Sequence, residues 1–61
     1  MKHRIYKPAD RVCARAAVRS LRDARDYLRA IGARRSLEKV RRALKSAEGA
    51  LRHVERTERA T

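Results

Sequence analysis

Residues 29–40, RAIGARRSLEKV, contain Gly32, a glycine within a long segment that has no other helix breaker. Glycine reaches the positive φ that closes many helices, and Ser36 can accept hydrogen bonds from the first free amides of a following helix. The stretch therefore predicts a connection over 32–35 and a second helix over about 36–59. A connection this short makes the two helices antiparallel neighbours.

The first helix is expected to begin at Pro8, because a first helical turn does not need the N–H group that proline lacks. Asp10 follows in that turn, where a carboxylate stabilises the positive end of the helix dipole. We therefore expect a basic arm over 1–7 and a first helix over about 8–31. The helical hairpin as a whole is assigned to 8–61.

Apolar residues recur at alternating steps of three and four in both segments, which is the spacing of one helix face. This face predicts the core of an all-α antiparallel two-helix hairpin. Glu58 interrupts the spacing, so the end of the second helix is expected to fray or to be exposed to solvent. The predicted core and dimer residues are Ala14, Ala17, Leu21, Leu28, Ile31, Leu37, Val40, Leu44, Leu51 and Val54.

The apolar surface is wider than the contact of two helices can cover. A chain of 61 residues has a small core, and its one cysteine excludes an internal disulfide. We therefore expect a homodimer in which two hairpins form a four-helix bundle. Cys13 is expected to be a small buried apolar group, with a disulfide across the dimer axis as the alternative. Small residues flank the core face at Ala9, Cys13, Ala16, Ser20, Ala30, Ala43, Ala50 and Thr57, together with Tyr27.

Positive charge dominates the composition, with 18 Lys+Arg against 7 Asp+Glu and a net charge of +11. A protein this positive repels itself, so a polyanionic partner that relieves the repulsion is a reasonable inference. Most of the basic residues are arginine, which presents paired donors to phosphate, although a GC-rich coding sequence would also enrich arginine. A solvated charged face is the simpler interpretation of either helix taken alone.

The acidic residues are placed unevenly along the two predicted helices. In the second helix, Glu38, Glu48 and Glu55 each stand four residues before an arginine, the favourable order for pairs within one helix. We therefore expect the second helix to be partly self-neutralised. In the first helix the basic residues form an arginine stripe on the face opposite the apolar one, at Arg11, Arg15, Arg19, Arg22, Arg25 and Arg29.

The charge predicts a small non-enzymatic protein that binds nucleic acid, DNA or RNA, through electrostatic contacts to the phosphate backbone. No helix-turn-helix spacing, zinc-finger pattern or base-stacking aromatic motif accompanies the charge. The alternative is a small regulatory or inhibitory module that docks on an acidic protein surface, using tyrosine and arginine as contact residues. The residues expected to contact a partner are Arg4, Arg11, Arg15, Arg19, Arg22, Arg29, Arg34, Arg35, Tyr6 and Tyr27.

The sequence offers little for catalysis, cofactor binding or metal binding. His3 and His53 are not spaced with Cys13 or an acid as metal ligands or as a nucleophile and base. No apolar run is long enough to span a bilayer, and an amphipathic surface without Phe or Trp is a poor membrane binder. We therefore expect no enzyme activity, no cofactor and no membrane partner, and a cytoplasmic location.

Overall fold

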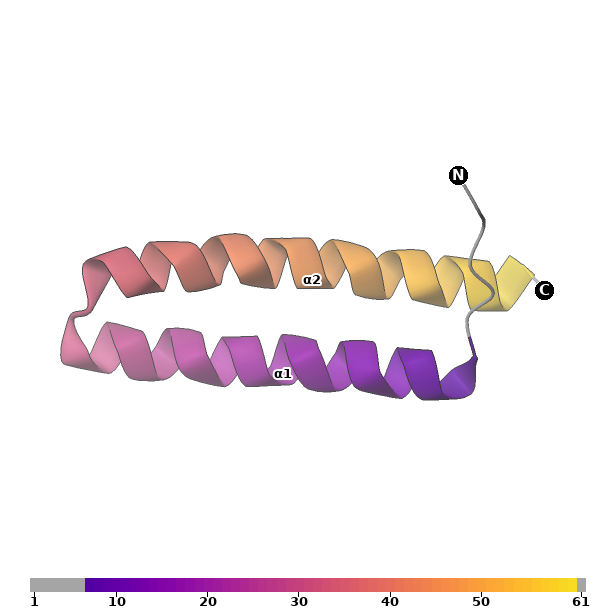
Figure 1. The fold of residues 1–61 in the computed structure, drawn as a ribbon, viewed down its shortest axis with the longest axis horizontal. Coiled ribbons are helices and arrows are strands. Elements are labelled where there is room, and N and C mark those ends of the chain that lie inside the picture. Colours follow the sequence, from indigo (N-terminus) through magenta and orange to yellow (C-terminus); the bar gives the residue numbers. More distant parts are fainter. Residues whose placement is uncertain (1–6, 61) are drawn as a thin grey trace.

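The computed structural model describes the backbone of residues 7–60 and the side chains of residues 7–58. Two helices, α1 (Pro8–Ile31) and α2 (Arg34–Ala60), lie side by side and antiparallel (Figure 1). The predicted all-α hairpin is therefore confirmed. The expected basic arm, with Arg4 and Tyr6, lies outside the described residues except for Lys7.

The start of α1 is held by two hydrogen bonds between Lys7 and Asp10, one to the Asp10 side chain and one between backbone groups. The Lys7 N–H donates to Oδ2 of Asp10 at 2.8 Å, and the Asp10 N–H donates to the Lys7 carbonyl at 2.9 Å. Asp10 thus satisfies an amide at the helix terminus and also places a negative charge at the positive end of the helix dipole. Pro8 occupies the first turn, as predicted.

The turn between the helices depends on Gly32, which has φ of 73°. Its N–H donates to the Arg29 carbonyl at 3.2 Å, and the Ala33 N–H donates to the Leu28 carbonyl at 3.0 Å. These two bonds satisfy carbonyls that the end of a helix leaves free, and a left-handed glycine is the residue that permits them. The predicted role of Gly32 is confirmed.

The connection is shorter than the predicted 32–35. The Ala33 carbonyl already accepts a helical bond from the Leu37 N–H at 2.9 Å, so α2 begins at Arg34 and Ser36 is not its N-cap. Arginine forms helices readily, and nothing in residues 34–35 forces the chain to leave the helical conformation. Both arginines therefore belong to the first turn of α2.

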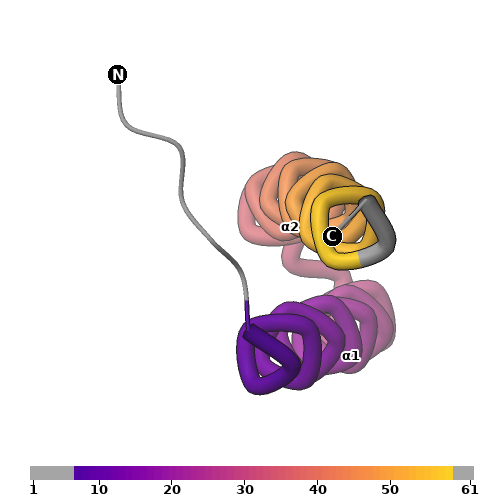
Figure 2. The backbone as a smooth tube through the Cα atoms, turned by 90° about the vertical axis from the view of Figure 1, so that its right-hand side faces the viewer, coloured from indigo at the N-terminus to yellow at the C-terminus, as the bar shows by residue number. Residues whose placement is uncertain are grey.

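The core is a single row of contacts between two helices. Val18, Leu44 and Val54 are 4%, 6% and 6% exposed, and they are the buried hydrophobic residues of the described chain. The molecule measures 43 × 22 × 13 Å, and its shortest dimension is close to the diameter of one helix with its side chains. Figure 2 shows the same arrangement end-on, with α1 and α2 as neighbouring tubes. The described chain is thus one layer thick.

We call the side chains of each helix that pack against the other helix its apolar seam. The apolar seam of α1 differs from the predicted core face. Val18, which the spacing did not select, is buried, whereas Ala17 is exposed and Ile31 is 76% exposed. The apolar arc of α1 is broad, and α2 packs against one flank of it rather than against its centre. Arg11 and Arg25, each seven residues from Val18, share its helix face and are half-buried. Because these two arginines interrupt the apolar spacing, the spacing did not indicate that this face packs against α2.

The seam of α2 agrees with the prediction. Leu44 and Val54 are buried, and Leu37, Val40 and Leu51 are half-buried. The fraying that the sequence predicted at Glu58 is not observed, because α2 continues to Ala60.

Cys13, which the sequence predicts to be a small buried apolar group, is exposed on the hairpin.

Candidate nucleic-acid interface

Three ion pairs join α1 to α2 along one edge of the hairpin. Arg15 Nη2 lies 3.2 Å from Glu55 Oε2, and Arg22 Nη2 lies 3.1 Å from Glu48 Oε2. The pairs are spaced by seven residues on both helices, and seven residues are close to two helical turns. The residues of this repeat therefore lie along one side of the contact between the helices. We call this side the ion-pair edge.

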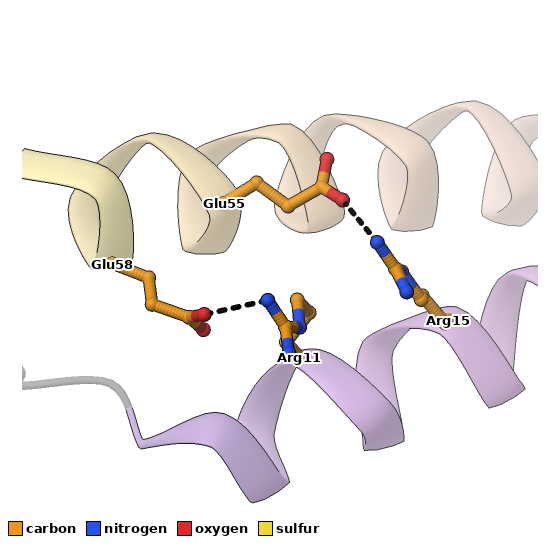
Figure 3. A pocket seen from close by; sticks show the side chains of 4 residues that line it. All are labelled: Arg11, Arg15, Glu55 and Glu58. Atoms are coloured by element: carbon orange, nitrogen blue, oxygen red, sulfur yellow. Dashed lines mark hydrogen bonds and ion pairs between the residues drawn. The ribbon is translucent and has the colours of Figure 1, made fainter.

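The third pair closes the open end of the hairpin. Arg11 Nη1 and Glu58 Oε1 lie 2.7 Å apart, and their side chains are 37% and 24% exposed. Figure 3 shows this pair beside Arg15 and Glu55, where the four side chains line an open cleft of about 200 Å³. A carboxylate at Glu58 thus continues the helix contact as a partner for Arg11. The solvent exposure predicted for the end of the second helix is therefore wrong at Glu58, because its pair with Arg11 keeps the side chain partly buried.

These contacts change the expected pairing of the acidic residues. Glu48 and Glu55 bond across the hairpin to α1. Within the described side chains, Glu48 pairs with Arg22 and forms no ion pair with Arg52, the arginine four residues later in α2. Arg59, the arginine four residues after Glu55, lies outside the described side chains. Glu58 is likewise bonded across the hairpin to Arg11. The acids of α2 therefore neutralise part of the arginine stripe of α1, and they set the alignment of the two helices.

The opposite edge of the hairpin carries small and apolar side chains. Ala17 and Ile31 of α1 and Ala43 and Ala50 of α2 are exposed there, and Ala24 is half-buried. All five follow the seven-residue repeats that flank the seam on the side away from the ion-pair edge. We call this surface the alanine edge. The molecule thus has one charged edge and one apolar edge.

The residues predicted to contact a partner fall into four groups. Arg11, Arg15 and Arg22 are engaged in the ion pairs described above. Tyr27 is 73% exposed on α1, on the side of the helix away from the ion-pair edge. Arg4 and Tyr6 lie outside the described residues. The remaining predicted residues, Arg19, Arg29, Arg34 and Arg35, are exposed and form no ion pair among residues 7–58.

Sequence reasoning missed Arg41 as a candidate, because the predicted list drew on α1 and the connection. Arg41 is exposed on α2 and forms no ion pair within the described part of the chain. The signal that could have found it is its distance of seven residues from Glu48, which places the two side chains on one helix edge. Arg25, in contrast, bonds to its neighbour Asp26 at 3.0 Å, and its side chain is only 30% exposed.

The side chains between residues 7 and 58 contain no group of three metal-ligating residues. Neither α1 nor the described part of α2 has an apolar stretch long enough to cross a bilayer. The exposed surface of these helices is instead dominated by arginine and lysine. Guanidinium and ammonium groups can form charge-assisted hydrogen bonds with anionic groups.

Comparisons with models of protein families, with curated proteins and with solved structures found no match to this chain.

Proposed function

We propose that this chain is a non-enzymatic protein that binds nucleic acid through electrostatic contacts between its arginines and the phosphate backbone. The observation that carries the proposal is the distribution of charge on the folded hairpin. Four of the seven acids are taken by ion pairs with Arg11, Arg15, Arg22 and Arg25. The surplus arginines remain on the surface, where a phosphate can accept two hydrogen bonds from each guanidinium.

Titration of mixed-sequence duplex DNA, single-stranded DNA and an RNA stem tests this function. Fluorescence anisotropy at about 50 mM and about 200 mM salt would give the affinity and its salt dependence. If a protein molecule neutralises about four phosphates of a duplex, the affinity should fall about 150-fold between the two salt concentrations. Polyglutamate of similar length is the matched control for an anion without phosphates. It should bind more weakly, because a carboxylate chain carries less charge per unit length than a duplex.

Lack of binding to all three nucleic acids at low salt would contradict this function. The same result would favour the alternative expected from the sequence, in which an acidic protein surface is the partner. Comparable affinities for DNA and polyglutamate would also count against a phosphate-directed protein.

We further propose that the working form is a homodimer in which a second copy covers the alanine edge, giving a four-helix bundle. Two facts support a second copy of the chain as the partner at the alanine edge. The single layer buries three hydrophobic side chains, whereas Ile31 and Tyr27 are mostly exposed. The alanine edge itself, made of Ala17, Ala24, Ile31, Ala43 and Ala50, carries no charge, so two copies can meet there with their ion-pair edges turned outward.

Sedimentation equilibrium tests the dimer, with Ala17→Glu as the disrupting variant. Ala16→Glu is the matched control, because Ala16 is also exposed but points about 100° away around α1. We expect the wild type and Ala16→Glu to be dimers at micromolar concentration and Ala17→Glu to be a monomer. A cooperatively folded wild-type monomer at that concentration would refute the dimer, and so would equal behaviour of the two variants.

A further inference from the structure

The ion-pair edge has a regular alignment that extends beyond its two central ion pairs. Seven residues forward along α1, from Arg15 to Arg22, correspond to seven residues backward along α2, from Glu55 to Glu48. One more step of seven leads to Arg29 on α1 and Arg41 on α2. The same repeat therefore brings two arginines to the place where the next Arg–Glu pair of the repeat would otherwise form.

A third arginine joins them at the end of the hairpin. Arg34 is seven residues before Arg41 and lies on the same edge of α2, in its first turn. We call Arg29, Arg34 and Arg41 the cationic edge. Along this edge α2 changes from acid to base as it approaches the turn, whereas α1 keeps arginine throughout.

The arginines of the cationic edge are not neutralised by the described part of the chain. All three are exposed, and none takes part in an ion pair among residues 7–58. Glu38 lies one helical turn from Arg34 and Arg41 but forms an ion pair with neither. Asp26 is bonded to Arg25. The acids nearest in sequence thus leave the guanidiniums available.

The local field around these residues is strongly positive. Arg34 and Arg41 are separated by about 10 Å along α2, and neighbouring helix axes lie about 8–10 Å apart. These distances are close to the Debye length in about 0.1 M salt, so the three charges repel one another. The first turn of α2 contains no acid, and the positive end of the helix dipole adds to the potential at Arg34.

We propose that the cationic edge is the primary phosphodiester-binding site of the protein, an assignment that rests on the proposed nucleic-acid function. A phosphate between Arg29 and Arg41 takes the place of the carboxylate that Glu48 and Glu55 supply to Arg22 and Arg15. Bidentate hydrogen bonds to the phosphate oxygens then relieve the repulsion between the arginines. The other half of the ion-pair edge serves to align the helices, since its arginines are already paired.

Replacement of two arginines by glutamine tests the site. Arg29→Gln/Arg41→Gln is compared with Arg52→Gln/Arg56→Gln, which removes the same charge from exposed positions of α2 outside the cationic edge. At about 100 mM salt we expect the first variant to bind duplex DNA about 30-fold more weakly and the control about threefold more weakly. Parallel titrations of an RNA stem show which source of phosphodiester binds better.

A charge reversal at Arg41 separates binding from folding. Arg41→Glu creates an additional Arg–Glu pair across the hairpin, with Arg29, so the melting temperature should rise by about 2–4 °C while binding falls at least as far as in the double variant. Arg56→Glu removes the same charge without restoring a partner across the hairpin. It should leave the melting temperature within about 1 °C of the wild type, and the loss of binding should be smaller.

Three other results would overturn the proposed site, and each has a different consequence. Equal losses of affinity in the two glutamine variants would show that the positive charge of the whole surface binds the nucleic acid. That result would overturn the site but not the nucleic-acid function. A lower melting temperature for Arg41→Glu would show that Arg29 and Arg41 do not face each other. Absence of binding by the wild type would overturn the nucleic-acid function and the site together.

Discussion

At the scale of single residues, the two glycines have opposite effects on the fold. Gly32 occupies the left-handed region with φ of 73°, which a residue with a Cβ reaches only at a cost. Gly49 lies inside α2 with ordinary helical geometry. A Cβ added at Gly49 would meet only Arg52 Nη2, at 3.9 Å. Gly32 therefore stabilises the turn, whereas Gly49 weakens its helix.

Alanine at each glycine should shift the stability in opposite directions. Gly49→Ala should raise the free energy of unfolding by about 1 kcal/mol, because alanine loses less backbone entropy in a helix. Gly32→Ala should lower it by about 1 kcal/mol, because of its positive φ. Thermal unfolding followed by circular dichroism should show shifts of about 5 °C in the two directions. Shifts of the same sign would contradict these assignments.

At the scale of the helices, the contact is a short apolar seam bordered by ion pairs. The side chains that decide it in α1 are Val18, Leu21 and Leu28, with Arg11 and Arg25 on the same face. Solvent-accessible ion pairs contribute little to stability, on the order of 0–1 kcal/mol each. Arg15–Glu55 and Arg22–Glu48 therefore act mainly by aligning α1 with α2, and the apolar seam supplies most of the attraction.

Two single variants, each with one valine of α1 replaced by alanine, test which face of α1 packs against α2. Val18→Ala should lower the free energy of unfolding by about 2 kcal/mol, because Val18 is 4% exposed. Val12→Ala is the matched control and should change it by less than about 0.5 kcal/mol, because Val12 is 62% exposed. Equal melting temperatures for the two variants would show that α2 packs against another face of α1.

At the scale of the whole molecule, unbalanced charge opposes the compact form. The chain has a net charge of +11, and its described part forms a single layer about one helix thick. The ion pairs of that layer neutralise only part of the charge. Repulsion between exposed charges acts over about a Debye length, so salt weakens it. The free protein is therefore expected to gain stability from any condition that screens or neutralises the arginines.

The melting temperature of the free protein should accordingly rise with salt. Between about 20 mM and about 300 mM potassium chloride, screening of the surplus positive charge should outweigh the weakening of the surface ion pairs. Thermal unfolding at one fixed protein concentration measures this, since a dimer adds a dependence on concentration. The Arg41→Glu variant should respond less, because it has less repulsion to screen. A melting temperature that falls with salt would mean that the ion pairs dominate.

Much of the hairpin follows from local signals. Pro8 and Asp10 mark the start of α1, Gly32 marks its end, and regular spacing identifies the seam of α2. The seam of α1 was harder to predict. Its apolar arc is wide enough for more than one packing direction, and arginines occupy two of the positions that α2 covers. Apolar spacing alone therefore favoured Ala17 and Ile31 over Val18.

The sequence predicted the chemistry of the candidate site, a surface rich in arginine, but not which residues form it. Composition indicated an anionic partner, and Arg29 and Arg34 were among the expected contact residues. Arg41 was missed, and Arg15 and Arg22 proved to be paired with acids of α2. Which arginines are paired depends on the alignment of residues that are 26 and 40 positions apart in the chain.

The amino-acid sequence by itself determined the two helices, the antiparallel hairpin and the excess of positive charge, because propensity, capping and composition act locally or add up along the chain. Only the tertiary structure decided which face of α1 meets α2 and which arginines remain without a carboxylate. The physical reason is that an ion pair across the hairpin requires two helices in one alignment. That alignment pairs Arg15 and Arg22 with glutamates, and one further step of seven residues in the same repeat places Arg29 opposite Arg41.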